Sequence, residues 1–155
     1  MNITRVLEGL AAGLLLAAWV FAGLTIPALP AIVPTHFGFS GVPDGAGPKA
    51  SLWALPVLCT VLYGIIIGTQ RLPMTALNFP VKITDRNREP VYALAREILP
   101  ALKAGAVLCF LGLEWGSIDS AARGGMSPIF VPAVYGPVVL IFAVLIVYTV
   151  RMRSA

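Results

Sequence analysis

Charged residues are scarce in this chain of 155 residues. Only 12% of the residues are charged, 58% are hydrophobic, and the mean hydropathy is +0.88. A soluble domain usually carries about a quarter charged residues, and water would not accept this much apolar surface. The composition therefore excludes a water-soluble globular fold. The length allows a single membrane domain, residues 1–155, whose apolar spans and short loops use nearly the whole chain.

Cysteine and histidine are almost as scarce. Cys59 and Cys109 lie inside apolar runs and form no CxxC pair, and His36 is the single histidine. A secreted disulfide framework is excluded, and no HExxH motif or closely spaced histidine pair points to zinc. We expect no cofactor and no catalytic residue. The two thiols fall at similar depth, so they touch if the second and third spans are neighbours; otherwise each fills the core as a small apolar residue.

Four stretches of the chain are nearly free of charge and long enough to cross a membrane. They cover about residues 9–33, 51–68, 98–118 and 129–150, and about 20 apolar residues suffice for a transmembrane helix. The first could pass for a signal peptide, but its length and its prolines favour a retained helix that ends near Pro27. In the third, Lys103 and Glu114 are expected near the two ends, within reach of water. The prediction is an all-α integral membrane protein, a four-transmembrane-helix bundle.

The basic residues predict the orientation of the bundle. With the N-terminus and the C-terminus cytoplasmic, nine of the eleven Lys and Arg residues fall inside and only Lys49 and Arg123 outside. Residues 69–97 then form an inner loop, and residues 34–50 form an outer loop. The same distribution explains the net charge of +4 and the pI near 9.4, so nucleic acid is not an expected partner.

The outer loop, residues 34–50, carries the most distinctive residues of the chain. It combines His36, Asp44 and Lys49 with several glycines and prolines, and Pro43 and Gly45 predict a tight turn. His36 either bonds to loop backbone and fastens the loop, or serves as a metal ligand or proton-transfer group. The partners available for the second role are Asp44, Glu114 and Asp119, and the weak metal alternative consists of His36, Asp44 and Glu114.

Glu114 is the most informative single charge. It lies about 6 Å inside the outer end of the third span, where a carboxylate is costly unless it is paired, hydrated or protonated. We expect it to face the bundle interior and to meet Lys49, Arg123 or His36, as a structural latch or as a proton or ligand site. The functional candidates are His36, Asp44, Lys49, Glu114 and Asp119.

Glycines at four-residue spacing are candidates for helix packing, since small residues let helix backbones approach closely in lipid. The three pairs are Gly9 and Gly13, Gly64 and Gly68, and Gly112 and Gly116. These pairs serve either the internal bundle or an external partner, and the spacing alone does not separate the two.

A group of motifs resembles a known family. The first loop contains Pro34, His36, Phe37, Gly41, Pro43, Asp44, Gly45 and Lys49, the second span contains Pro56, and Asn78 to Thr84 and Glu114-Trp115 follow. These motifs are similar to those of small bacterial membrane proteins with the domain of unknown function 1648, which also occurs in the SdpI-like group of bacteriocin-immunity and signalling proteins. The resemblance implies a multi-pass protein of the bacterial inner (plasma) membrane. This chain lacks the extra spans of longer SdpI-like members.

Three functions are compatible with these features. The favoured one is a non-enzymatic membrane protein, an accessory subunit or an immunity or sensing component, that contacts another membrane protein or a further copy of itself within the lipid bilayer. The alternatives are a membrane-embedded hydrolase or metal-dependent enzyme that uses His36 and Asp44, and a small carrier or lipid-binding protein. A carrier usually places polar groups near the midplane, and the spans of this chain are apolar there.

Overall fold

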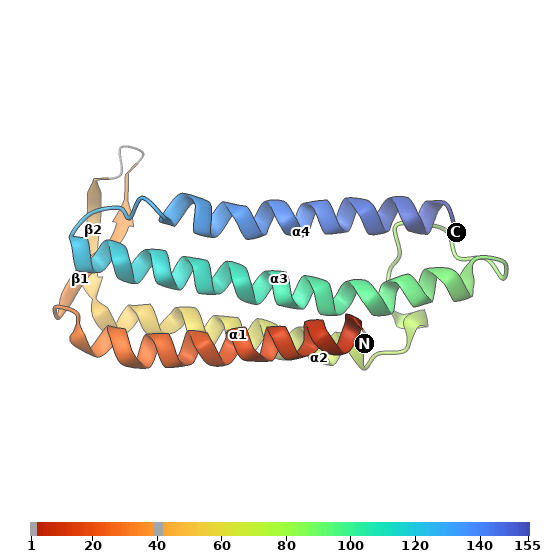
Figure 1. Cartoon of the computed structure of the whole chain (residues 1–155), viewed down its shortest axis with the longest axis horizontal. Helices are drawn as coiled ribbons and strands as arrows, with labels where there is room; N and C mark the ends of the chain where they lie inside the picture. The colour runs from red at the N-terminus through yellow and green to blue at the C-terminus, as the bar shows by residue number, and fades with distance from the viewer. Residues whose placement is uncertain (1–2, 39–41) are drawn as a thin grey trace.

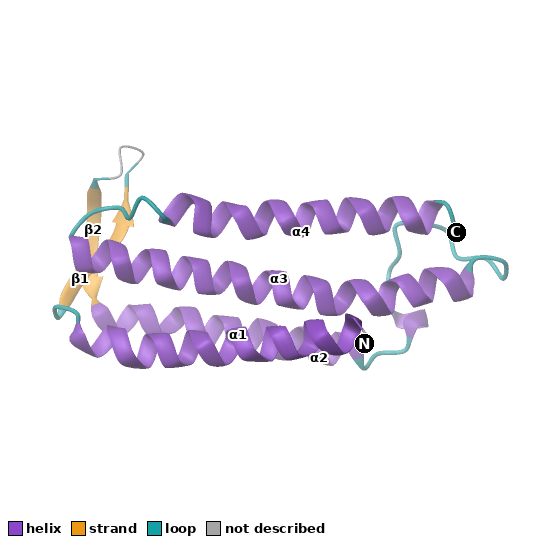
Figure 2. Ribbon diagram, in the orientation of Figure 1, coloured by secondary structure: helices purple, strands orange, loops and turns teal. Residues whose placement is uncertain are grey.

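A computed structural model of the chain describes residues 3–38 and 42–155. Four long helices run side by side and a short two-stranded sheet lies at one end (Figure 1, Figure 2). The long helices are α1 (Ile3–Thr25), α2 (Ala54–Gln70), α3 (Arg88–Arg123) and α4 (Phe130–Arg153). The short 3-10 helices are η1 (Ile26–Ala28), η2 (Lys49–Trp53) and η3 (Met74–Ala76), and the strands are β1 (Ile32–Phe37) and β2 (Pro43–Pro48). Gly41 of the loop motif lies outside the described residues.

The bundle has two distinct ends. Both termini lie at one end, here called the terminal end, and the β1–β2 hairpin lies at the other, the hairpin end (Figure 1). Helix α3 occupies the middle and packs on α1 and α2 on one side and on α4 on the other. All four helices, taken with the adjoining η1 and η2, are long and apolar enough to span a bilayer. The chain is therefore a multi-pass membrane protein, as its composition predicts.

Two helices are longer than the sequence suggests. Helix α1 begins at Ile3 rather than near residue 9, and α3 runs for 36 residues with Pro100 inside it. The polar segment before residue 98 and the third apolar stretch thus form one continuous helix. Lys103 consequently lies in the interior of α3 and is fully buried, so the expectation that it reaches water near a helix end is wrong.

The outer loop, residues 34–50, contains a β-hairpin that an all-α prediction omits. Strands β1 and β2 pair antiparallel, with Val33 opposite Gly47 and His36 opposite Gly45. Glycine suits this strand because a Cβ on Gly45 would lie 3.0 Å from the Cβ of His36. Val33 is 1% exposed and packs in an apolar cluster with Ile26 and residues of α3. The hairpin is thus anchored on the ends of the helices.

The contact between α3 and α4 depends on glycine. A Cβ on Gly112 would overlap the carbonyl oxygen of Ala133, and one on Gly116 would lie 2.7 Å from the ring of Phe130. Pro137 lies inside α4 and has no N–H, so the carbonyl of Ala133, four residues earlier, has no helical donor. This carbonyl points at Gly112, where only a Cα fits. A proline of α4 and a glycine of α3 therefore form one matched contact.

The other two glycine pairs do not pack inside the bundle. A Cβ on Gly9, Gly13, Gly64 or Gly68 would meet nothing within 4 Å. Gly105, which the four-residue spacing does not single out, does face α4, because a Cβ there would lie 2.8 Å from Ile141. Among the described glycines, those in close contact with another long helix are all on α3.

Replacing Gly112 by alanine should push α4 away from α3. We expect the free energy of unfolding of Gly112→Ala, measured in detergent, to fall by about 1–3 kcal/mol, the usual cost of overpacking. Gly64→Ala is the matched control, since its Cβ meets nothing and alanine is the better helix former. Equal stability of the two variants would contradict the close α3–α4 contact.

Candidate functional site

The two buried ionisable residues, Lys103 and Glu114, lie on one stripe of α3. Lys103, Val107, Glu114, Ile118 and Ala121 recur at helical spacing and are all buried. Ile118 and Ala121 pack with residues of η1 and η2, so the stripe faces α1 and α2. The glycines that contact α4 lie on the opposite side of α3. One face of α3 is thus shaped for close backbone packing, and the other carries two ionisable groups.

Lys103 ties three helices together near the terminal end. Its Nζ forms an ion pair with Glu8 of α1 and donates a hydrogen bond to Oε1 of Gln70 of α2 at 3.1 Å. Nε2 of Gln70 donates to the other carboxylate oxygen of Glu8 at 2.7 Å. The ring centroid of Tyr63 lies 4.9 Å from the ammonium nitrogen. A buried lysine requires such partners, because an unpaired charge in this environment is costly.

The sequence pattern alone does not reveal this cluster. Glu8 precedes the first uncharged stretch, and Gln70 falls within the predicted inner loop, residues 69–97. A signal was present: if Glu8, Gln70 and Lys103 all lie inside helices at the same end of the bundle, they are the natural partners of one another. The predicted first and second spans exclude Glu8 and Gln70, so this pairing is not evident from the sequence.

Glu114 lies three helical turns further along the same stripe. Its side chain is 1% exposed, and its Oε1 has no hydrogen-bond partner among the described residues. Cys59 of α2 is also 1% exposed and lies within electrostatic reach of the carboxyl. Glu114 faces the bundle interior, but none of its expected partners reaches it. The carboxyl group of Glu114 is therefore separate from the charged cluster around Lys103.

The three expected partners of Glu114, which are Lys49, His36 and Arg123, bind other groups. Lys49 donates to the carbonyl oxygens of Pro27 at 2.6 Å and Leu29 at 2.8 Å, and so caps the end of the first helical segment. Nδ1 of His36 pairs with Oδ1 of Asp44 across the exposed hairpin. The His36 and Asp44 side chains are 73% and 52% exposed, whereas Glu114 lies inside the bundle. The three residues of the metal alternative therefore do not converge, and the described residues contain no cluster of three or more His, Cys, Asp or Glu side chains.

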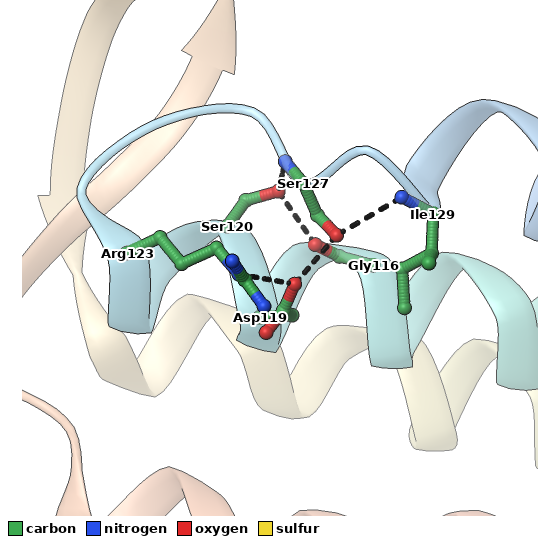
Figure 3. Close-up of polar contacts among 6 residues, drawn as sticks. All are labelled: Gly116, Asp119, Ser120, Arg123, Ser127 and Ile129. Carbon is green, nitrogen blue, oxygen red and sulfur yellow. Dashed lines mark hydrogen bonds and ion pairs between the residues drawn. The ribbon is translucent and has the colours of Figure 1, made fainter.

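Asp119, the last of the candidate residues from the sequence, belongs to a hydrogen-bond network at the turn between α3 and α4 (Figure 3). Its Oδ2 accepts hydrogen bonds from Nε of Arg123 at 2.8 Å and from Oγ of Ser127 at 2.5 Å. The backbone N–H of Ser127 donates to Oγ of Ser120 at 2.8 Å, and that hydroxyl donates to the carbonyl of Gly116 at 2.6 Å. These hydrogen bonds satisfy polar groups of the turn between α3 and α4, so Asp119 has a structural role here.

The two cysteines serve different interfaces. Cys59 is buried on α2 within electrostatic reach of Glu114, whereas Sγ of Cys109 lies 3.9 Å from the carbonyl oxygen of Val134 of α4. Both thiols are free. Their similar depth, inferred from the sequence, does not bring them together, because they lie on opposite sides of the α3 axis.

These features define a class: a multi-pass membrane protein in which two spans are joined by a β-hairpin fastened by a lysine. Comparison with known sequences gives the family. Residues 13–60 match the domain of unknown function DUF1648. An uncharacterized protein of the archaeon Archaeoglobus fulgidus is 30% identical over 127 residues, which cover 72% of this chain and 68% of that protein. The chain belongs to the DUF1648 family, and no solved structure matches it.

The matched segment corresponds to a defined structural unit. Residues 13–60 run from the middle of α1, through the hairpin, into the first turns of α2. The unit includes His36, Asp44, Lys49 and Cys59. Its two helices are also joined by a hydrogen bond of 2.9 Å from Nε1 of Trp19 to Oγ1 of Thr60. Lys103 and Glu114 belong to α3, outside this segment.

Removing Lys103 should expose the cost of an unpaired carboxylate. We expect Lys103→Met to lower the free energy of unfolding by about 2–4 kcal/mol, because Glu8 loses its cation. The double variant Glu8→Gln with Lys103→Met should recover part of this loss, since no unpaired charge remains. Thermal unfolding in detergent measures both, with the exposed Lys82→Met as control. A double variant less stable than Lys103→Met alone would contradict the pairing.

Proposed function

We propose that this protein is a non-enzymatic component of the membrane that acts through helix contacts with a membrane partner. In the terms of its sequence resemblance, it is an accessory subunit or an immunity or sensing component of the SdpI-like kind. The observation that carries this proposal is that no described residue of the bundle packs against the glycine pairs of α1 and α2.

The unpartnered faces are continuous along each helix. On α1, Gly9 and Gly13 are followed at helical spacing by Leu16 and Val20, which are 66% and 52% exposed. The corresponding stripe of α2 consists of Val57, Val61, Gly64 and Gly68. Both stripes combine small residues with apolar side chains that no part of the described chain covers.

The physical reason for a partner comes from the bundle itself. Lipid chains are as apolar as leucine, so helices associate in a membrane through close packing and polar contacts. On α3, Gly112 and Gly116 provide this close packing and receive α4. Gly64 and Gly68 have the same spacing, and no described residue packs against them. Glycine inside a helix costs up to about 1 kcal/mol relative to alanine, and contact with a second helix offsets that cost.

The orientation forms part of the proposal. The terminal end carries nine of the eleven basic residues, and the hairpin end carries Lys49 and Arg123. Under the positive-inside rule the terminal end is cytoplasmic, and the hairpin with His36 and Asp44 faces outward. We place the protein in the inner (plasma) membrane of a prokaryote, with the partner in the same bilayer.

The His36–Asp44 pair favours a second candidate, a hydrolytic or metal-dependent site on the hairpin. A carboxylate at Nδ1 orients the ring and leaves Nε2 available to a metal or a substrate proton. Among the described residues, no group of three or more His, Cys, Asp or Glu side chains that could hold a metal ion includes this pair. The geometry therefore supports this function less well than partner binding.

A photoreactive amino acid at Ile65, beside the glycine pair of α2 and 59% exposed, should crosslink to a protein in native membranes. Val139 of α4, 66% exposed, is the control position and should label lipid. Gly64→Leu should abolish the protein adduct at Ile65, because leucine blocks close approach, whereas Gly136→Leu on α4 should leave it intact. Lipid adducts alone at both positions, together with a monomer in native mass spectrometry, would contradict partner binding.

The proposed orientation is tested separately in intact cells. Impermeant reagents should label an epitope inserted in the hairpin and should not reach tags on either terminus until the membrane is broken. A terminal tag accessible from outside would reverse the assignment.

A further inference from the structure

Glu114 is a buried acid that the proposed function does not use. It lies nine residues before Arg123, the last residue of α3, which places it about 14 Å inside the helix end at 1.5 Å per residue. It is 1% exposed, and its Oε1 has no partner among the described residues. In a membrane protein an ionisable group at such a position is a functional candidate in its own right.

Apolar residues close the stripe on both sides of Glu114. Toward the hairpin end, Ile118 packs in a buried cluster with Ala22, Ile26 and Leu52. Toward the terminal end, Val107 is 2% exposed and separates the carboxyl from Lys103. Buried apolar residues of α3 therefore flank Glu114 on both sides along this stripe.

Among the described residues, no cation pairs with Glu114 from the elements packed around it. From α2, Cys59 lies within electrostatic reach of the carboxyl, and from α1 the buried residues of this region are Ala18 and Ala22. Lys103, on α3 itself, is eleven residues away, about 16 Å along the helix, and is paired with Glu8.

The titratable groups nearer the hairpin end are also committed. Asp119 binds Arg123 and Ser127, and Lys49 binds backbone carbonyls of the segment after α1. Helix α4 packs on the opposite face of α3, through Cys109 and the glycines. An ionised Glu114 would thus have no counter-charge, which is among the most costly arrangements inside a membrane.

We propose that Glu114 is a proton-binding site of the membrane interior, and that the bound proton holds α2 against α1 and α3. The neutral acid fits the closed bundle described above. Loss of the proton places a charge between α2 and α3 that only water or a counter-ion stabilises, and entry of either requires the helices to separate.

Helix α2 is the element that such a charge displaces most easily. Only Pro56 and Cys59 of α2 are buried, whereas fourteen residues of α3 are. Helix α2 is held at the terminal end by Gln70 and in the middle by the bond from Trp19 to Thr60. Cys59 directly precedes Thr60, on the hairpin side of both ties, and lies within electrostatic reach of Glu114, so its accessibility reports the separation.

The first experiment tests the protonated acid in the unaltered protein. A hydrophobic carbodiimide reacts with a neutral carboxylic acid in an apolar environment and remains attached as an N-acylurea, which mass spectrometry locates. In vesicles of phosphatidylethanolamine and phosphatidylglycerol, we expect labelling of Glu114, with less labelling as the pH rises. Glu97, which is half-buried and accepts a hydrogen bond from Tyr148 near the terminal end, is the internal control. Absence of label at Glu114 at every pH would overturn the proposal.

The second experiment tests the coupling to α2. Alkylation of Cys59 by N-ethylmaleimide is compared with that of Cys109 from about pH 5 to about pH 9, a range in which buried carboxyl groups titrate. Both thiols react faster as thiolates, and Cys109 corrects for this effect. We expect the rate at Cys59 to rise about tenfold more than the rate at Cys109, which corresponds to about 1.4 kcal/mol in the opening equilibrium.

The conservative variant decides the cause of that rise. Glu114→Gln keeps the shape and removes the titration, so the extra rise at Cys59 should disappear while Cys109 is unchanged. An identical pH profile in Glu114→Gln, or parallel profiles of the two thiols in the unaltered protein, would overturn the coupling. Neither outcome depends on a partner protein, so failure here is distinct from failure of the proposed function.

Discussion

Apolar side chains gain little by leaving lipid for protein, so a bundle in a membrane needs some other source of cohesion. This protein uses two, and α3 supplies both. On one face, Gly112 and Gly116 let the backbone of α4 approach closely. The carbonyl of Ala133, which Pro137 leaves without a helical donor, then contacts Gly112. On the other, Lys103 binds Glu8 and Gln70. The rest of the architecture follows from α3 as the central helix.

The same constraint separates structural polar groups from functional ones. Lys103, Lys49 and Asp119 each have their hydrogen-bonding capacity directed at named partners, and each closes a contact between segments of the chain. Glu114 has no such partner for Oε1, and the glycine stripes of α1 and α2 have no helix against them. These two features are the basis of the two proposals, a proton site within the bundle and a contact surface for a membrane partner.

Much of the architecture was predictable because lipid imposes simple rules. Four charge-poor stretches indicated four helices, and the proline after Thr25 indicated where α1 ends. The motifs of the first loop indicated the DUF1648 family, which the comparisons confirm. The site was predicted less well. His36 and Asp44 do meet, but Glu114 does not join them, because the hairpin stands outside the helices while Glu114 faces their interior.

The sequence by itself determined that this chain lies in a bilayer, how many times it can cross the bilayer, and which family it belongs to. These properties depend on composition and local patterns. Tertiary structure alone decided which glycines hold helices together, which charges pair, and which acid is left single. Those outcomes depend on the rotation of each helix about its axis and on the ends of α1 and α3. A shift of a few residues in either changes which side chain faces which neighbour, and hydropathy does not record it.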